Sequence, residues 1–331
     1  MSQPHDRLFK DVFGEPRYAA QHLRESLPAD LLPWVDLDGL ERVDASFVDA
    51  ELSERHADLL FATRLKSGED ILFYLLFEHQ STVDPLMAWR ILQYVVLIWA
   101  HWLQEHPEAR RLPMVYPLVL YHGQRRWSAP LDIADLVDLP APARAAAGGA
   151  VPSLRYQLGD LSDTPDEALT SGALVAMVKL LFKHYQEPDL LDRLPEWTGV
   201  FARAAQEGGL RAVELATRHI LKVTVDTRGV AVLEAVMGEA VGAESRNVVK
   251  SVADQLEARG REEGREEGRE EGREEGRLLQ SRTFLLRMLE RRFGEVSDEA
   301  RACVNAADLD TLTRWVDDFF LADSVEALLH R

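Results

Sequence analysis

The sequence predicts an α/β fold with helical additions, and two observations lead to this prediction. Hydrophobic patterns follow one another as helix, strands, helix, strand and then helices alone, an order typical of a sheet covered by helices. The chain has 331 residues, 46% hydrophobic and 8% aromatic, which is the composition of a folded protein. That length suffices for one large domain with appendages or for two ordinary domains.

The spacing of the apolar residues places the expected elements along the chain. Helical spacing predicts helices at 5–13, 18–27 and 87–103, and mostly helices after residue 166. Alternation and short apolar runs predict strands at 44–52, 57–65, 71–78, 114–123 and 153–161. The nearly all-apolar strand 71–78 is expected in the centre of the sheet. The tract 141–150, rich in Ala, Pro and Gly, is expected to be a surface loop.

Two of these strands, 57–65 and 71–78, are predicted to form an antiparallel hairpin around Gly68, the residue best suited to a positive φ. In the register centred on Gly68, Asp58 faces Glu78. Facing side chains lie about 4.5–5.5 Å apart and like charges there repel, so we expect a proton or a cation between the two carboxylates. Mg²⁺, which prefers oxygen ligands, resolves the conflict. The alternatives are a solvent-facing pair, or ion pairs with Arg55, Arg64 or Arg90.

The same strand ends abruptly on Glu78, His79 and Gln80. Ionisable groups at a buried strand end need partners, because an unpaired buried carboxylate costs several kcal/mol or shifts its pKa. Strand alternation puts Gln80 on the same face as Glu78 and leaves the backbone carbonyl of His79 available. Gln80 is either a residue that orients a reacting group or a polar cap of the strand.

Several segments occur together in a characteristic order: "HDRLFKDVF", "LPADLL", "SFVDAEL", "ADLLF", "LLFEHQS", "MAWRILQYVV", "YPLVLYHGQRRW" and a REEG tail. With these segments the chain resembles the recombination-promoting nuclease (Rpn) family, the YhgA-like putative transposases, over most of residues 4–200. The resemblance is specific, because "FEHQS" and "YPLVLYHG" keep their spacing from the strand that carries Asp58. The family is taken to belong to the PD-(D/E)xK nuclease superfamily. The resemblance therefore implies a restriction-endonuclease-like mixed sheet flanked by helices, with a helical C-terminal extension.

The resemblance also implies a function, the hydrolysis of phosphodiester bonds in double-stranded DNA with Mg²⁺ or Mn²⁺, linked to recombination or mobile elements. Asp58 fills the aspartate position of the motif, and Glu78 and Gln80 fill the (D/E)xK positions. The implied metal ligands are Asp58, Glu78 and the carbonyl of His79. Ala57 replaces the Pro of the pattern, and Gln80, which replaces its Lys, carries no positive charge. One alternative is a catalytically weak nuclease-like module that binds DNA or assembles with partners, and another is a helical interaction protein.

Further candidates lie outside this motif. Asp6 is a secondary catalytic candidate, since restriction-like folds often bring an acidic residue of the first helix near the metal, but it equally suits the start of a helix. Tyr121 and His122 either border the site or belong to the buried fold. The segment 124–127, "QRRW", offers two arginines and an aromatic residue for a DNA backbone, or it is an ordinary solvated loop.

Charge and cysteine content limit the partners and the compartment. The net charge of −18 argues against nonspecific binding of polyanions, although residues 261–276 alone carry eight Glu against four Arg. The single cysteine, Cys303, excludes an intrachain disulfide and a cysteine-based zinc site. The N-terminus does not resemble a secretory signal, and no apolar run is long enough to span a membrane, so we expect a cytoplasmic protein.

A perfect repeat, "REEGREEGREEGREEG", precedes the last helical patterns. Its glycines would form one stripe of a helix but cost about 1 kcal/mol each relative to Ala, so the repeat is either a self-association or spacer helix or a flexible linker. We expect homo-oligomers through the C-terminal region. The predicted organisation is a nuclease-like domain at 1–200, a helical region at 201–259, the repeat at 260–277, and a C-terminal segment at 278–331 with helices at 278–293 and 308–329.

Overall fold

The chain divides into two compact units, Met1–Ala253 (unit 1) and Asp254–Arg331 (unit 2). The computed structural model describes residues 4–44, 57–78, 83–169 and 172–329. Unit 1 contains the sheet and two hydrophobic cores, and unit 2 has a separate core. The finer boundaries predicted at residues 200 and 260 stay predictions.

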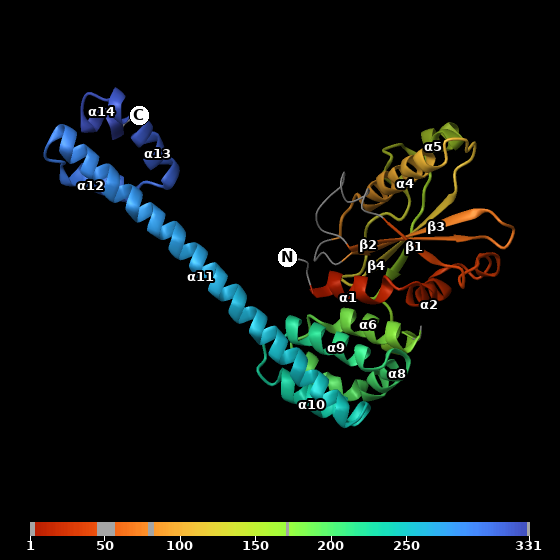
Figure 1. Ribbon diagram of the computed structural model, residues 1–331. Coiled ribbons are helices and arrows are strands. Elements are labelled where there is room, and N and C mark those ends of the chain that lie inside the picture. The colour runs from red at the N-terminus through yellow and green to blue at the C-terminus, as the bar shows by residue number, and fades with distance from the viewer. Residues whose placement is uncertain (1–3, 45–56, 79–82, 170–171, 330–331) are drawn as a thin grey trace. The chain divides into compact units, whose positions relative to one another are not determined.

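Unit 1 is built on one mixed sheet of five strands in the order β1-β2-β3-β4-β5 (Figure 1). The β1–β2 and β2–β3 pairs are antiparallel, and the β3–β4 and β4–β5 pairs are parallel. As predicted, the apolar third strand is central. The strands are β1 (Glu41–Val43), β2 (Ala57–Arg64), β3 (Asp70–Glu78), β4 (Met114–Tyr121) and β5 (Gln157–Asp160).

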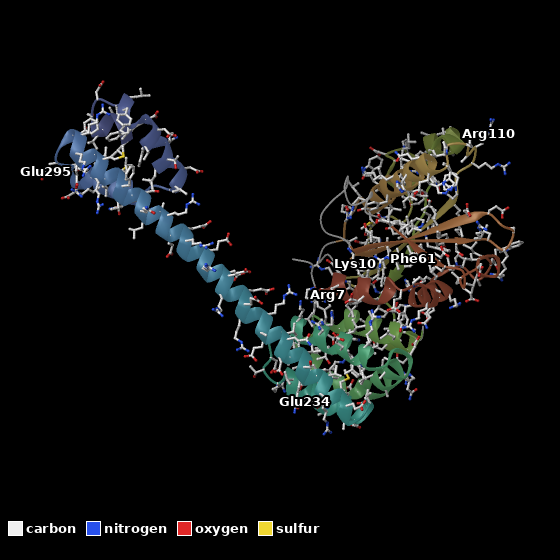
Figure 2. The ribbon with its side chains drawn as sticks, in the orientation of Figure 1. Arg7, Lys10, Phe61, Arg110, Glu234 and Glu295 are labelled. Carbon is white, nitrogen blue, oxygen red and sulfur yellow. The ribbon has the colours of Figure 1, made fainter. Side chains whose placement is uncertain are left out.

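Helices cover both faces of this sheet (Figure 1). On one face, α4 (Met87–Glu105) shares a core with Leu60 of β2. On the other face, α1 (Pro4–Phe13) and α2 (Pro16–Ser26) share a core with Phe61, which is labelled in Figure 2. Neighbouring residues of β2 thus point to opposite faces, as strand geometry requires. The predicted α/β class, a mixed sheet flanked by helices, is confirmed.

A further helical layer extends unit 1 beyond α1. Helices α6 (Ala173–His184) and α9 (Leu210–Val223) both contact α1, and α8 (Thr198–Gly208) packs against α6 and α9. The prediction of mostly helices after residue 166 is therefore confirmed. Unit 1 also contains α5 (Ala141–Ala147), α7 (Leu190–Arg193) and α10 (Gly229–Ala240).

One stretch differs from the prediction, and another lies mostly outside the described residues. The tract 141–150, predicted to be a loop, forms α5 and a 3-10 turn at Gly148–Ala150. Pro142 stands in the first turn, where a missing N–H costs nothing, and alanine is the best helix former. Most of the strand predicted at 44–52 lies outside the described residues, and the short β1 precedes it.

The REEG repeat lies inside one helix, α11 (Ala243–Phe293). The helical alternative is therefore the one observed. An ion pair one turn apart, from Arg259 to Glu263 at 2.7 Å, supports it. A Cβ placed on any glycine of the repeat meets no atom within 4 Å, so the described part of the chain leaves this stripe uncovered.

Unit 2 is a small helical core around the last turns of α11. Arg292 donates a hydrogen bond of 2.9 Å to the carbonyl of Ala322, and its guanidinium lies 5.2 Å from the centre of the Phe319 ring. The helix predicted at 308–329 is interrupted, because the backbone turns extended at Ala322. Among the described residues no helix is long and apolar enough to cross a membrane. The helices packed on α11 are α12 (Asp298–Ala306), α13 (Leu309–Asp318) and α14 (Val325–Leu329).

Candidate active site

The predicted site residues gather at one end of the sheet, which we call the polar end. It is formed by the first residues of β2 and the last residues of β3, β4 and β5. Parallel pairing aligns Glu78 with Tyr121, and Tyr121 with Asp160. Asp58 lies at the start of β2, and its partner Leu76 is near the end of β3. Strands far apart in the sequence therefore bring their polar ends together.

The predicted hairpin forms, but its register differs from the prediction. Asp58 pairs with Leu76 and not with Glu78, so the expectation that the two carboxylates face each other directly is wrong. The cause is the turn. Residues 65–69 form a five-residue loop closed by the Leu65 N–H, which donates to the carbonyl of Glu69 at 2.8 Å. Gly68 has the expected positive φ of 108°, but the centre of the hairpin lies one residue earlier, which shifts the pairing by two.

Asp58 is held by a buried tyrosine. The hydroxyl of Tyr74 donates a hydrogen bond of 2.7 Å to Oδ2 of Asp58, and the other carboxylate oxygen, Oδ1, is buried. Burial and then the neighbouring Asp58 charge raise the pKa of Tyr74 well above its usual value. The hydroxyl therefore keeps its proton and remains a donor. A charge-assisted bond of this length fixes the orientation of the carboxylate.

The polar contacts continue from Tyr74 into α4. The rings of Tyr74 and Tyr94 lie 5.1 Å apart, and the hydroxyl of Tyr94 accepts a bond of 3.4 Å from Arg90. Arg90 also forms an ion pair of 3.0 Å with Asp84. The alternative in which Arg64 neutralises Asp58 is not seen, since Arg64 pairs with Asp70 at 3.4 Å. A row of polar groups thus leads from Asp58 to the start of α4.

The other members of the predicted motif lie partly outside the described structure. The backbone of Glu78 closes β3 at the polar end, two positions beyond the partner of Asp58. His79 and Gln80 lie outside the described residues. Their predicted roles, and that of the Glu78 side chain, stay predictions.

The start of α1 reaches the same end of the sheet from the opposite face. His5 lies 5.4 Å from His122, measured between ring centres, and His122 follows directly on the last residue of β4. Asp6 is the next residue of α1, and its predicted catalytic role stays a prediction. Tyr121 and His122 are both buried, which fits the reading that they belong to the fold.

A third histidine completes this contact. The ring of His219, from α9, lies 5.0 Å from that of His5 and 5.8 Å from that of Phe182. All three histidines are buried. Burial, and next the charge that His5 can carry, lower the pKa of His219 from 6.5 to about 3. His219 is therefore neutral at physiological pH, and we call this group, His5, His122 and His219, the histidine cluster.

The predicted DNA-contacting segment 124–127 is anchored at the polar end. The Trp127 N–H donates to the Asp160 carboxylate at 2.9 Å, and Trp127 Nε1 lies 3.1 Å from the Tyr156 hydroxyl. Arg125 and Arg126 are exposed beside it. Arg126 pairs with Asp163, whereas no residue of the described structure forms an ion pair with Arg125.

Sequence reasoning missed Tyr74, because a tyrosine inside an apolar strand looks like an ordinary core residue. A usable signal existed, since Tyr74 and Glu78 occupy positions of the same parity on β3. Within the described ranges, no group of three His, Cys, Asp or Glu side chains is arranged to bind a metal ion. Of the predicted ligand set, only the Asp58 side chain is described, and its carboxylate is a donor of the kind that Mg²⁺ prefers.

Comparisons with known proteins agree on one family. A family model described as "Putative transposase, YhgA-like" matches residues 3–210. The recombination-promoting nuclease RpnD of Escherichia coli O157:H7 is 35% identical over 193 residues, which make up 57% of this chain and 71% of RpnD. RpnA of strain K12, with the same description, is 32% identical over 57% of this chain and 63% of its own length.

A third relative is named differently. RpnE of Escherichia coli K12 is called an inactive recombination-promoting nuclease-like protein and is 28% identical over 61% of this chain and 65% of its own length. The chain thus spans less than two thirds of RpnA and of RpnE. No solved structure matches the chain.

Proposed function

Because this chain belongs to the YhgA-like putative transposase family, we propose that it is a metal-dependent endonuclease that hydrolyses phosphodiester bonds in double-stranded DNA during recombination. The names of RpnD and RpnA support the nuclease activity and its link to recombination. The observation that carries the proposal is the Asp58 carboxylate, fixed by Tyr74 at the end of the sheet where Glu78 closes β3.

The proposed metal is Mg²⁺ or Mn²⁺, held by Asp58, Glu78 and the carbonyl of His79. When bound, it supplies an activated water and neutralises charge on the phosphate. Asp58 fits this role, because its carboxylate is oriented by a hydroxyl that does not ionise. Gln80 and Asp6 are proposed to orient the attacking water through their polar side chains.

The proposed substrate contact is the segment 124–127. Arg125 and Arg126 are exposed next to the polar end and carry the charge that a phosphate backbone requires. Their backbone is fixed through Trp127 and Asp160, which limits the entropy lost on binding. In a chain of net charge −18, Arg125 is the residue of this segment that we propose to meet the phosphate backbone.

A second candidate function is a nuclease-like protein that binds or assembles on DNA with little cleavage. RpnE, a relative named inactive, and the Gln80 that replaces a lysine favour it. We also propose that the C-terminal region joins copies of the chain, because unit 2 exposes Phe284, Phe320 and Leu321. The single cysteine supports placing the protein in a reducing compartment, the cytoplasm.

The experiment is cleavage of supercoiled plasmid by purified protein, with Mg²⁺ and with EDTA, beside Glu78→Ala and Asp58→Ala variants. We expect cutting that requires the metal and is absent in both variants. A Glu167→Ala variant, which changes an exposed carboxylate elsewhere in unit 1, serves as the matched control and should cut like the wild type. DNA retention in a gel without any cutting would favour the second function. Equal background in every lane, with no retention, would contradict both.

A further inference from the structure

Helix α4 brings a cation, Arg90, to the face of the sheet that carries Asp58. Leu60 of β2 shares a core with α4, and Asp58 precedes it by two positions, so the Asp58 side chain points to the same face. Tyr74, whose hydroxyl holds Asp58, belongs to this core as well. Arg90 therefore lies on the same side of the sheet as the carboxylate that we propose to bind the metal.

The guanidinium of Arg90 is held in place by two anchors. Its Nη1 lies 3.0 Å from Oδ2 of Asp84, and its Nη2 donates to the hydroxyl of Tyr94 at 3.4 Å. The other carboxylate oxygen of Asp84, Oδ1, accepts a hydrogen bond of 2.8 Å from the N–H of Leu86. The backbone at the start of α4 thus fixes Asp84, and Asp84 in turn fixes Arg90.

The ion pair between Arg90 and Asp84 is largely but not fully buried. The two side chains are 21% and 22% exposed. Removing such a pair from water costs about as much free energy as the attraction returns, so the pair is weak evidence for a role in stability. The exposed fifth of Arg90 leaves room for an anion to approach. An anion is attracted more strongly there than in bulk water, because the effective dielectric constant is lower.

The charge of Arg90 also acts on the group that orients Asp58. Burial and then the Asp58 charge raise the pKa of Tyr74, and the charge of Arg90 opposes them. The Tyr74 hydroxyl lies 2.7 Å from Asp58, so Arg90 is within electrostatic range of the proposed metal ligand. Hydrolysis of a phosphodiester places negative charge on the phosphate oxygens, and a preorganised cation stabilises that charge. A guanidinium suits phosphate oxygens well, since its N–H donors form a planar fork.

We propose that Arg90 binds the phosphate that is to be cleaved and that Asp84 positions the guanidinium for this contact. The proposal rests on the proposed nuclease function, because it names how the same site holds its substrate. With five N–H donors, one guanidinium can hold a carboxylate, a hydroxyl and a phosphate oxygen together. Arg125 then meets another part of the DNA backbone. The competing explanation is that Arg90 only fastens the start of α4.

The first test is the salt dependence of DNA retention, which separates a phosphate contact from a structural role. The full chain and its Arg90→Gln and Arg90→Lys variants are mixed with a short DNA duplex in EDTA at several salt concentrations. Each phosphate contact adds about 0.9 to the slope of log K against log salt concentration. We therefore expect Arg90→Gln to reduce the slope by about 0.9 and Arg90→Lys to preserve it.

The matched control is Arg64→Gln. Arg64 also pairs with an aspartate, Asp70 at 3.4 Å, but lies at the other end of β2 from Asp58. This variant should retain the wild-type slope. Circular dichroism of every variant checks the fold. Arg90→Met, which keeps part of the apolar stem, takes the place of Arg90→Gln if that variant does not fold.

The second test is plasmid cleavage in Mg²⁺ with the same proteins. We expect Arg90→Gln to cut at least about 100-fold more slowly than the wild type, and Arg90→Lys to stay within about tenfold of it. Asp84→Asn keeps the charge of Arg90 and an oxygen for the Leu86 N–H. It should therefore preserve the salt slope and lower only the cleavage rate, as expected of a positioning residue.

The outcomes separate this proposal from the nuclease function on which it rests. Equal salt slopes for the wild type and Arg90→Gln would overturn the phosphate contact, whatever the cleavage rates. Equal cleavage by these two proteins would also overturn it and leave the nuclease function standing. If no chain cuts DNA, the nuclease function fails, while a lower slope in Arg90→Gln still supports the phosphate contact. Absence of both cleavage and retention in the wild type would overturn both.

Discussion

At the polar end, the ionisable residues on the two faces of the sheet have different surroundings. On the α4 face, Asp58 receives a hydrogen bond from Tyr74 and lies near a row of polar groups that includes Arg90. On the α1 face, the histidine cluster is packed among aromatic rings, and burial lowers the pKa of His219 to about 3. One face orients the Asp58 carboxylate, and on the other face burial keeps His219 neutral. This contrast shows that the immediate surroundings decide whether an ionisable residue is held for chemistry or only packed.

The largest loss of stability is expected when a permanently charged side chain replaces a residue of the histidine cluster. We expect His219→Lys to lower the free energy of unfolding by about 4 kcal/mol or more, because it buries an unpaired ammonium. Urea denaturation followed by circular dichroism measures this loss. His219→Phe, which keeps an aromatic ring and removes the ionisable group, should cost less than about 1.5 kcal/mol. Equal losses in the two variants would mean that this face does not exclude charge.

On the other face, removing the charge should affect chemistry more than stability. We expect Asp58→Asn to reduce metal-dependent cleavage at least about 100-fold, because an amide is a poor ligand for Mg²⁺. The amide oxygen can still accept from Tyr74, so the free energy of unfolding should change by less than about 1 kcal/mol. Plasmid cleavage and urea denaturation on the same samples separate the two effects. A variant that cuts normally would remove Asp58 from the proposed site.

The pH dependence of the free energy of unfolding should reveal the lowered pKa of His219. Above pH 6.5 His219 is neutral in both the folded and the unfolded chain, so it does not change the free energy of unfolding. As the pH falls from 6.5 towards 3, the unfolded chain binds a proton that the folded chain does not, and His219 lowers the free energy of unfolding by about 1.4 kcal/mol per pH unit. The loss at pH 5 is therefore about 2 kcal/mol. His219→Phe should remove this component, and an unchanged acid profile in that variant would contradict the assignment.

The smallest expected effect concerns the hydroxyl that orients Asp58. We predict that Tyr74→Phe weakens the apparent affinity for Mg²⁺ about tenfold, as the loss of a residue that orients a ligand commonly does. Titration of Mg²⁺ in the cleavage assay measures the shift. Tyr116→Phe, on the same sheet but away from Asp58, is the matched control and should leave the Mg²⁺ dependence unchanged. A shift of equal size in the control would show that the hydroxyl of Tyr74 has no special role.

Local patterns in the sequence predict much of the fold and less of the site. The apolar spacing that predicts α1, β3 and α4 reflects burial on one or both faces, and these elements form where expected. The hairpin register was missed, because one residue of difference in the centre of a turn moves every pair, and the turn chemistry of residues 65–69 suits both centres. The tract 141–150 shows the related difficulty that alanine and proline occur both in loops and in first turns of helices.

The contacts at the polar end could not be predicted from short stretches of the sequence. Tyr74 holds Asp58 only because the hairpin brings them together, and the even spacing from Glu78 is the one sign in "ILFYLLFE" that marks this tyrosine. His5 and His219 meet only when α9 has packed on α1. A single sequence carries no direct sign of such long-range pairs. The hairpin and the strand end supplied Asp58, Glu78 and Gln80 as candidates, the resemblance to a family supplied their implied roles, and the geometry supplied the neighbours of Asp58.

The position of His5 has a consequence for the timing of synthesis. Helix α1 leaves the ribosome before α9 does, but His5 of α1 packs against His219 of α9. A nascent chain that stops before α9 lacks His219, against which His5 packs. The surroundings of Asp6, the next residue of α1, are then incomplete. Truncated translation products are therefore expected to lack a complete polar end. For a proposed nuclease, such an order of assembly would keep unfinished chains from cutting the chromosome of the cell that makes them.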